Sequence, residues 1–296
     1  MDERDFLAER FEENRAHLGA VAYRMLGSLS DAEDAVQEAW LRLSRADASG
    51  VENLGGWLTT VVARVCLDML RTRAARREET LSPHGPGPLA SHGDDTDPES
   101  EAVLADSVGL ALLVVLDTLS PAERIAFVLH DTFGLPFDEI ARIVGRSPAA
   151  TRQLASRARR RVRGGGGATM PDVDRARQRE VVDAFLAACR HGDFEALLAV
   201  LDPDVLLHAD RSAVPAGAPT ELRGAATVAR NALTASRGAR TARPALVNGS
   251  VGVIVAPGGR LYRVLDFTIR NGKIVAIDVV ADPERLRRFE VGVLEA

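Results

Sequence analysis

LSPAERIAFVLHDTFGLPFDEIARIVGRSPAATRQLASRARRRVR, residues 119–163, is the stretch that decides the fold of the middle of the chain. Its first part predicts a capped helix, because Ser120 is a favourable N-cap residue and Pro121 is favoured at the first helical position. Phe127 and Leu129 then fall on the side of this helix that we expect to be buried.

A second and a third helix follow at close spacing. The second begins at Pro136, and Gly145 stands where the chain must leave it through a left-handed residue. Ser147 and Pro148 repeat the cap signal at the start of the third helix. Apolar positions recur at helical spacing in both: Phe137, Ile140, Ala141 and Val144, then Leu154, Ala155, Ala158 and Val162. The order of these elements predicts a helix-turn-helix.

The third helix carries a concentrated positive charge. Between Ser147 and Arg163 there are six arginines and no acidic residue. Arginines outside the buried stripe can neutralise phosphates, while Arg152, Gln153 or Arg157 can reach base edges in a major groove. A solvated face is the alternative reading of an isolated basic helix. The apolar helix, glycine turn and capped basic helix occur together here, which favours a DNA reader.

The composition predicts a folded protein of two or three domains. The chain has 296 residues, of which 46% are apolar. No stretch approaches the roughly 20 apolar residues of a membrane span, and the charged N-terminus is unlike a signal peptide, so we expect a cytoplasmic protein without membrane contact. Cys66 and Cys189 lie far apart in apolar helical patterns, which predicts buried free thiols. We expect no metal and no cofactor, because Cys and His do not cluster.

The net charge of −5 hides a segregation of charge along the chain. Residues 57–77 hold five arginines against the single acid Asp68, whereas residues 78–106 hold eight acids and neither Lys nor Arg. Two basic segments therefore flank an acidic one. An acidic protein can still bind DNA when its positive charge is concentrated in this way.

Two further helical stretches precede the acidic segment, after a first helix over residues 6–26. We expect Ser30 to cap a helix in which Trp40 packs inward and the acids face outward. That acidic face is either a solvated surface that complements the helix dipole or a docking surface. The next helix opens at Trp57, and its face opposite the apolar stripe carries Arg64, Asp68 and Arg71 before the chain reaches Arg73, Arg76 and Arg77.

Three segments together resemble an extracytoplasmic-function sigma factor of RNA polymerase. They are SLSDAEDAVQEAWLRL, GWLTTVVARVCLDMLRTRAARR and the helix-turn-helix stretch, which resemble sigma regions two and four in order. The resemblance implies two all-α helical domains that bind core RNA polymerase, at the β′ clamp helices and the β flap. It implies that the acidic helix docks on the clamp helices through Asp31, Glu33, Asp34 and Gln37.

The same resemblance implies two sets of promoter contacts. Region four would read the −35 element through Arg146, Thr151, Arg152, Gln153, Arg157 and Arg160. Region two would bind the −10 element and the melted strand through Asn53, Arg64, Asp68, Arg71 and Arg73. The implied function is that of an alternative sigma factor, which directs promoter recognition, DNA melting and transcription initiation.

After the hinge GGGGATMPD the chain predicts an α+β domain. Helical patterns at residues 181–189 and 194–201 precede strand patterns at 205–208, 252–255, 261–269 and 273–280, with turns at Pro257–Gly259 and Asn271-Gly272. RHGDFEALLAVLDPDVLLHAD and RLYRVLDFTIRNGKIVAIDVVADPERL resemble the SnoaL-like fold, a cone-shaped sheet that closes on a pocket. Sigma factors with this extension form the SigJ-like group, which implies that the extension contacts the sigma core and modulates it in cis.

The expected domains are therefore residues 1–77 for region two, 78–106 for an acidic flexible linker, 107–163 for region four, 164–172 for a hinge and 173–296 for the SnoaL-like domain. The alternative is a DNA-binding module fused to a SnoaL-like enzyme or ligand-sensing domain. Such an enzyme would use a base in the cone, and the candidates are His208, Asp210, Tyr262, Asp266 and Asp278. We expect no catalytic residue, because no paired carboxylates occur at a diagnostic spacing.

Overall fold

The computed structural model describes residues 3–45, 53–80, 109–164, 172–236 and 242–294. Two compact units emerge from the contacts within the chain. The first comprises Met1–Leu104 and Thr118–Arg159, and its described elements are helical. The second comprises Ala105–Asp117 and Arg160–Ala296, and it is built on a β-sheet. The predicted fold class is confirmed. Most of the predicted acidic linker and most of the predicted hinge lie outside the described residues.

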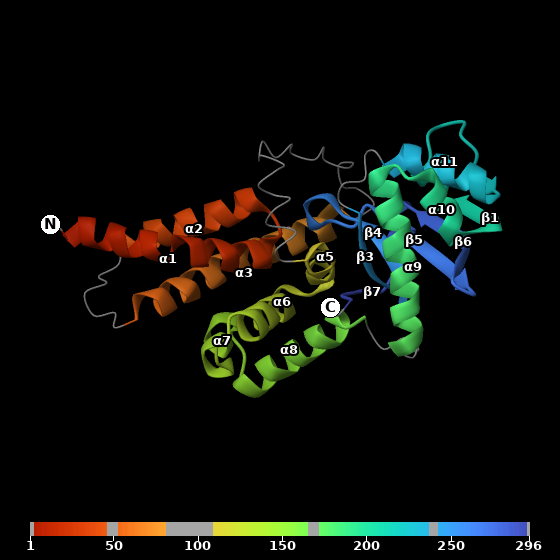
Figure 1. The fold of residues 1–296 in the computed structure, drawn as a ribbon. Helices are drawn as coiled ribbons and strands as arrows, with labels where there is room; N and C mark the ends of the chain where they lie inside the picture. The colour runs from red at the N-terminus through yellow and green to blue at the C-terminus, as the bar shows by residue number, and fades with distance from the viewer. Residues whose placement is uncertain (1–2, 46–52, 81–108, 165–171, 237–241, 295–296) are drawn as a thin grey trace. The chain divides into compact units, whose positions relative to one another are not determined.

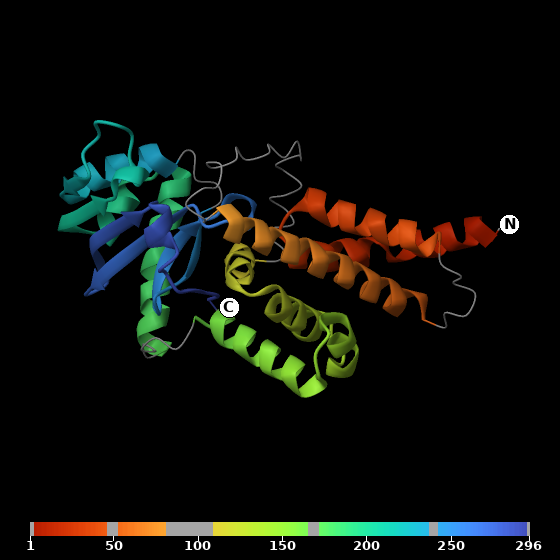
Figure 2. The ribbon, with the colours of Figure 1, turned by 180° about the vertical axis from the view of Figure 1, so that it is seen from behind.

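Three long helices pack side by side in the first unit (Figures 1 and 2). They are α1 (Glu3–Leu26), α2 (Leu29–Leu43) and α3 (Leu54–Thr80). The rings of Phe11 and Trp40 lie 5.1 Å apart between α1 and α2, which confirms that Trp40 packs inward. The apolar side chains that these helices bury completely include Leu18, Val21, Met25, Leu43, Leu58, Val62 and Cys66.

The cap of α2 differs from the prediction. Ser28, not Ser30, is the N-cap residue, and its Oγ accepts a hydrogen bond from the backbone N–H of Asp31 at 3.3 Å. Gly27 precedes it with a φ of 72°, which ends α1 in a left-handed residue. The helix therefore begins at Leu29, because Ser28 lies three residues before the N–H that needs a partner.

The helix-turn-helix of the first unit has the predicted local structure. It consists of α6 (Pro121–Phe127), the π-helical turn η1 (Val128–Thr132), α7 (Phe137–Val144) and α8 (Pro148–Val162). Ser120 and Glu123 form a reciprocal capping box at the start of α6. Gly145 ends α7 in the left-handed conformation at φ 70°. These contacts confirm the predicted caps and turn.

One mixed sheet organises the second unit, and its described strands follow the order β2-β1-β6-β5-β4-β3-β7. All neighbouring pairs are antiparallel except β1 and β6, which are parallel. The strands are β1 (Leu201–Ala209), β2 (Glu221–Arg223), β3 (Ala242–Val247), β4 (Ser250–Val255), β5 (Arg263–Arg270), β6 (Lys273–Val280) and β7 (Val291–Gly292). The turn between β5 and β6 uses Asn271 and Gly272, both with positive φ, as predicted.

Both faces of this sheet carry an apolar core. The inner face packs against α9 (Asp172–His191), α10 (Phe194–Val200) and α11 (Ala225–Ser236). The outer face packs against α5 (Leu110–Thr118) and the short helix α12 (Pro283–Leu286). Neighbouring residues of a strand point to opposite faces, so Val253 lies in the inner core and Ile254 in the outer one.

The sequence patterns missed several elements of this unit. β1, β4, β5 and β6 were predicted, whereas β2, β3, β7, α5 and α11 were not. β3 contains Pro244, which weakens a strand pattern, although Pro is tolerated near a sheet margin. β2 and β7 are too short to produce an alternation of apolar and polar residues. α5 lies inside the segment predicted as region four, yet it belongs to the unit that contains the sheet.

Candidate nucleic-acid interface

The start of α8 is fixed by its own cap. The Oγ of Ser147 accepts a hydrogen bond from the backbone N–H of Ala150 at 3.2 Å. The sharp turn at Gly145 sets the direction in which α8 leaves α7, and Ala155 and Ala158 of α8 are fully buried. The opposite side of α8 is therefore held toward solvent as one rigid surface.

Arginine and glutamine side chains occupy this exposed side of α8. Arg146, Arg152, Gln153, Arg157 and Arg160 are all exposed. The guanidinium carbon of Arg152 lies 5.7 Å from the centroid of the Phe137 ring, a cation–π distance that restrains the side chain beside the start of α7. The arrangement can place a donor-rich surface in a DNA groove.

Two carboxylates hold other arginines of α8. The Nε of Arg157 lies 3.7 Å from a carboxylate oxygen of Glu123, which is itself buried in the capping box of α6. The Nε of Arg159 donates a 2.5 Å hydrogen bond to Asp131. Sequence reasoning missed both acids as partners, because each lies far from its arginine along the chain. The pairing orients Arg157, while half of its side chain stays accessible.

Thr151 is the exception among the residues expected to contact the −35 element. Its side chain is fully buried, and its Oγ1 donates a 2.9 Å hydrogen bond to the carbonyl of Ser147. A side chain in this position cannot reach a base edge. In this structure the hydroxyl of Thr151 instead closes the first turn of α8, away from the exposed face of the helix.

The acidic helix α2 presents three of its four expected contact residues. Glu33, Asp34 and Gln37 are exposed, whereas Asp31 is half-buried. Asp31 forms an ion pair with Arg73 of α3, and Arg73 also donates a hydrogen bond to the carbonyl of Leu26. Asp31 and Arg73 were expected on two different binding surfaces, but in this structure they bind each other.

The expected single-strand contacts on α3 lie along its exposed side. Arg64, Asp68 and Arg71 are exposed, and Arg71 lies 3.8 Å from Asp68 at i,i+3 spacing. Asn53 is exposed too, but its Oδ1 accepts a hydrogen bond from the N–H of Gly56 at 3.0 Å and so caps α3. The surface carries positive charge beside hydrogen-bonding groups, as a nucleic-acid contact requires.

A buried arginine ties the helix-turn-helix to α1, and it was not predicted from the sequence. Arg124 of α6 is 4% exposed and donates a 3.0 Å hydrogen bond to the carbonyl of Met25 near the end of α1. Nearby, the His17 and Phe133 rings meet edge to face at 5.4 Å. An arginine that follows the capping glutamate within a buried helical stripe was the only available signal.

Comparison with known proteins identifies the family of the chain. Residues 10–76 match the family model of sigma-70 region 2, and residues 109–162 match that of sigma-70 region 4. The chain is 40% identical to the extracytoplasmic-function (ECF) RNA polymerase sigma factor SigJ of Mycobacterium tuberculosis, over 93% of this chain and 91% of that protein. The chain belongs to the ECF sigma factors.

Two further relatives extend this comparison. The sigma factor is 37% identical to a probable ECF RNA polymerase sigma factor, SigI of Mycobacterium tuberculosis, over 99% of both chains. It is also similar to the crystal structure of Mycobacterium tuberculosis SigJ, with 37% identity, coverage of 95% of this chain and 98% of the other, and a TM-score of 0.45. The sequence similarity to SigJ and SigI covers 93% and 99% of the chain and so includes the domain that follows region four.

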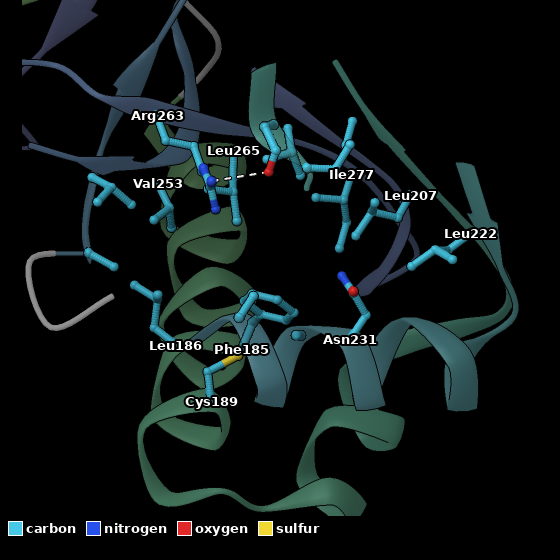
Figure 3. A pocket seen from close by; sticks show the side chains of 18 of the residues that line it. Phe185, Leu186, Cys189, Leu207, Leu222, Asn231, Val253, Arg263, Leu265 and Ile277 are labelled. Carbon is cyan, nitrogen blue, oxygen red and sulfur yellow. Dashed lines mark hydrogen bonds between the residues drawn. The ribbon is translucent and has the colours of Figure 1, made fainter. Parts of the chain in front are cut away.

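A pocket on the inner face of the sheet is lined by residues that include Phe185, Val253 and Ile277 (Figure 3). The candidate bases of the sigma factor's C-terminal domain do not converge on this pocket. Asp266 and Asp278 face each other across β5 and β6, and the pKa of Asp266 is raised by burial and by the charge of Asp278. Tyr262 is 55% exposed. His208 and Asp210 complete the set, and none of the five lines the pocket. The structure thus does not bring the five candidate bases together in this pocket.

Asp210 has a structural task instead. Its Oδ2 accepts hydrogen bonds from the N–H groups of Ala281 and Asp282 at 3.0 and 2.8 Å, at the start of the DPERL segment. Among the described residues there is no group of three or more His, Cys, Asp or Glu side chains that could hold a metal ion. Within the same part of the chain, no helix combines the length and the apolar character that a membrane span requires.

Proposed function

We propose that α8 of this ECF sigma factor reads the −35 promoter element. The observation that carries this proposal is the exposed face of α8, where Arg152, Gln153 and Arg160 project from a helix fixed by its cap and by its buried alanines. Arginine can donate two hydrogen bonds to guanine in the major groove, whereas glutamine can donate one hydrogen bond to N7 of adenine and accept one from its N6 amino group. Arg146 and Arg157 flank this face and are suited to phosphates.

The first three helices are proposed to supply the polymerase contact and the −10 contact. Glu33, Asp34 and Gln37 on α2 offer an acidic surface to the β′ clamp helices, and Arg64 and Arg71 on α3 offer cations to a melted strand. The ion pair between Asp31 and Arg73 joins the two helices, so both surfaces would be held by one rigid scaffold.

The C-terminal domain is proposed to modulate the sigma factor in cis rather than to catalyse a reaction. Helix α5 supports this proposal, since its residues match the start of region four while its side chains pack on the outer face of the sheet. A conformational change in the sheet would therefore act on the chain directly before α6. The absence of His, Asp and Glu from the lining of the pocket supports a non-catalytic role.

Run-off transcription with purified core polymerase tests both parts of the proposal. The template carries a promoter found by selection, and the full-length protein is compared with a truncation that ends at Arg163. Core-dependent transcription that changes on truncation is the expected result. Addition of residues 173–296 as a separate chain should restore the full-length behaviour, because α5 would regain its binding surface.

Two results would contradict the proposal. Equal DNA affinity with and without core polymerase, and no transcription, would favour a DNA-binding module fused to an enzyme. Identical transcription by both forms would remove the cis modulation and leave the sigma activity intact.

A further inference from the structure

The inner face of the sheet encloses a pocket in the second unit (Figure 3). Its volume is about 380 Å³, and residues of α9, α11, β1, β4, β5 and β6 line it. Phe185, Leu207, Val253, Leu265 and Ile277 supply much of its apolar wall. Pockets of this size and lining are typical of sites for small molecules.

The pocket is open because small side chains line it. Six alanines belong to the wall: Ala209, Ala213, Ala218, Ala232, Ala235 and Ala242. Apolar side chains that face open space lack dispersion contacts on that side, and this lowers the stability of the fold. Larger side chains in the wall would supply these contacts. Occupation by an apolar body would restore these contacts.

A single arginine provides the most buried polar group of the pocket. The Nη2 of Arg263 donates a 3.1 Å hydrogen bond to the carbonyl of Ala213, whereas its Nε is buried without a hydrogen-bond partner among the described residues. Figure 3 shows Arg263 reaching in from β5 and Asn231 pointing in from α11. An unsatisfied buried donor of a charged group is costly, and a ligand acceptor would satisfy it.

The other polar residues that line the pocket carry no negative charge that would neutralise Arg263. Arg190 also lines the pocket and donates a 3.2 Å hydrogen bond to the carbonyl of Ala242. Burial raises the pKa of the Cys189 thiol to about 11, so this group is uncharged at neutral pH. The described lining thus contains two guanidinium groups and no carboxylate, which favours an anion.

We propose that this pocket binds a small monocarboxylate with an apolar, ring-sized body. The body fills the alanine-lined space, and the carboxylate accepts hydrogen bonds from Arg263 and Asn231. At about 30 Å³ of liquid volume for each water-sized group, the pocket holds on the order of a dozen non-hydrogen atoms. A long-chain lipid exceeds this volume.

A continuous set of contacts leads from Arg263 to α5, and here the inference rests on the proposed cis modulation. Arg263 binds Ala213 in the short helix η2 (Arg211–Ala213), which directly follows Asp210. Asp210 holds the start of the DPERL segment, and Leu286 of that segment packs in the same apolar cluster as α5. A ligand that draws on the Arg263 donors would therefore act on an element of region four.

Calorimetric titration of the full-length protein with 2-naphthoate tests the binding site. This monocarboxylate has the expected size, and 2-naphthamide has the same shape without the charge. We expect 2-naphthoate to bind about tenfold or more tightly than 2-naphthamide, because a charge-assisted hydrogen bond is stronger than a neutral one. Arg263→Met should abolish this preference while retaining the weak binding of 2-naphthamide, which would show that the pocket is intact.

Two matched variants locate the site. Arg270→Met removes an exposed arginine at the other end of β5 and should leave binding unchanged. Ala232→Phe fills the pocket from α11 and should abolish binding of both compounds. The inference is overturned if 2-naphthoate fails to bind, if Arg263→Met binds it as tightly as the unmodified protein, or if Ala232→Phe still binds it.

Run-off transcription separates this inference from the proposed function. We expect 2-naphthoate to change the transcript yield of the full-length protein and not that of Arg263→Met. If truncation after Arg163 leaves transcription unchanged, the proposed modulation fails while the calorimetric result on the pocket stands. If truncation changes transcription but 2-naphthoate does not bind, the pocket inference fails alone.

Discussion

Arg152 differs from its neighbours on α8 in the group that restrains it. Glu123 holds Arg157 and Asp131 holds Arg159, whereas Arg152 lies beside the ring of Phe137. An aromatic ring restrains a guanidinium without neutralising its charge, and so leaves its donors available to an acceptor. At the scale of single residues, Arg152 is therefore the arginine of α8 best prepared for base recognition.

Substitution of Arg152 tests this role. Arg152→Ala should weaken discrimination of the −35 element by about 1 to 3 kcal/mol, the range for a bidentate contact to guanine. Competition binding of holoenzyme to promoters with single −35 substitutions measures the effect. Arg177→Ala, which removes an exposed arginine of α9, is the control. An unchanged order of promoter preference would exclude Arg152 from base readout.

Asp266 predicts a dependence of stability on pH. Burial and then the charge of Asp278 raise its pKa, so the folded protein binds the proton more tightly than the unfolded chain. This contribution is fully present below the unfolded pKa of about 3.9 and is lost as pH rises through the raised folded value. Asp266→Asn should therefore raise the melting temperature at neutral pH.

Melting temperatures measured from pH 4 to 7 test this expectation. The gain from Asp266→Asn should shrink as pH falls toward 4, because a growing share of the native carboxyl is then protonated and uncharged. Asp204→Asn, at an exposed position of β1, should show no comparable gain. A gain that is equal at all pH values would point to packing rather than to ionisation.

At the scale of elements, the caps of the helix-turn-helix were predictable and the position of α5 was not. Ser120, Gly145 and Ser147 act on the backbone within a few residues, so their spacing in the sequence suffices. The helix LALLVVLDT of α5 is apolar on every side and gives no indication of its partner. Its contact with the sheet depends on residues that are more than a hundred positions away.

For the candidate contact residues, too, spacing in the sequence predicted local features but not long-range packing. Spacing correctly placed Arg64 and Arg152 on exposed faces. It could not show that Asp31 pairs with Arg73 or that Thr151 is buried, because both facts depend on how helices pack. The inward orientation of Arg263 could have been predicted from the sequence. Arg263, Leu265 and Phe267 are spaced two residues apart along β5 and therefore share its inner, apolar face.

The capping box of α6 gives a prediction at this scale. Ser120→Ala should lower the free energy of unfolding by about 1 to 2 kcal/mol, since it removes the cap and one hydrogen bond to the buried Glu123 carboxylate. Urea titration followed by circular dichroism measures the change. Ser120→Thr retains the hydroxyl and should cost much less. Equal losses for both variants would contradict the capping role.

At the scale of the whole molecule, the unit that contains the sheet also includes α5, which lies outside the range 173–296 predicted for the C-terminal domain. The outer core combines Leu110, Val114 and Val115 of α5 with apolar residues of β3 to β6. A chain of residues 173–296 therefore exposes the part of the outer apolar face that α5 covers, while α12 still covers another part. Apolar faces of this kind promote self-association.

The fragment of residues 173–296 tests whether α5 is a part of this unit. Residues 173–296 alone should self-associate and bind the dye 8-anilinonaphthalene-1-sulfonate, and a peptide of residues 105–118 should reverse both effects. Light scattering and dye fluorescence measure them. A peptide with Val114→Asp and Val115→Asp is the control and should have no effect. A monomeric domain without dye binding would contradict the role of α5 as a part of this unit.

The close approach of Gly164 and Gly292 affects the order in which the chain can mature. The N–H of Val293 donates a 2.8 Å hydrogen bond to the carbonyl of Val162 at the end of α8, and a Cβ atom on Gly292 would overlap the backbone of Gly164. Ribosomes add about 5 to 20 residues per second, so Val293 emerges on the order of ten seconds after Val162. The last turn of α8 thus gains this hydrogen bond only when synthesis has passed β7, and a nascent chain stalled before that point lacks it.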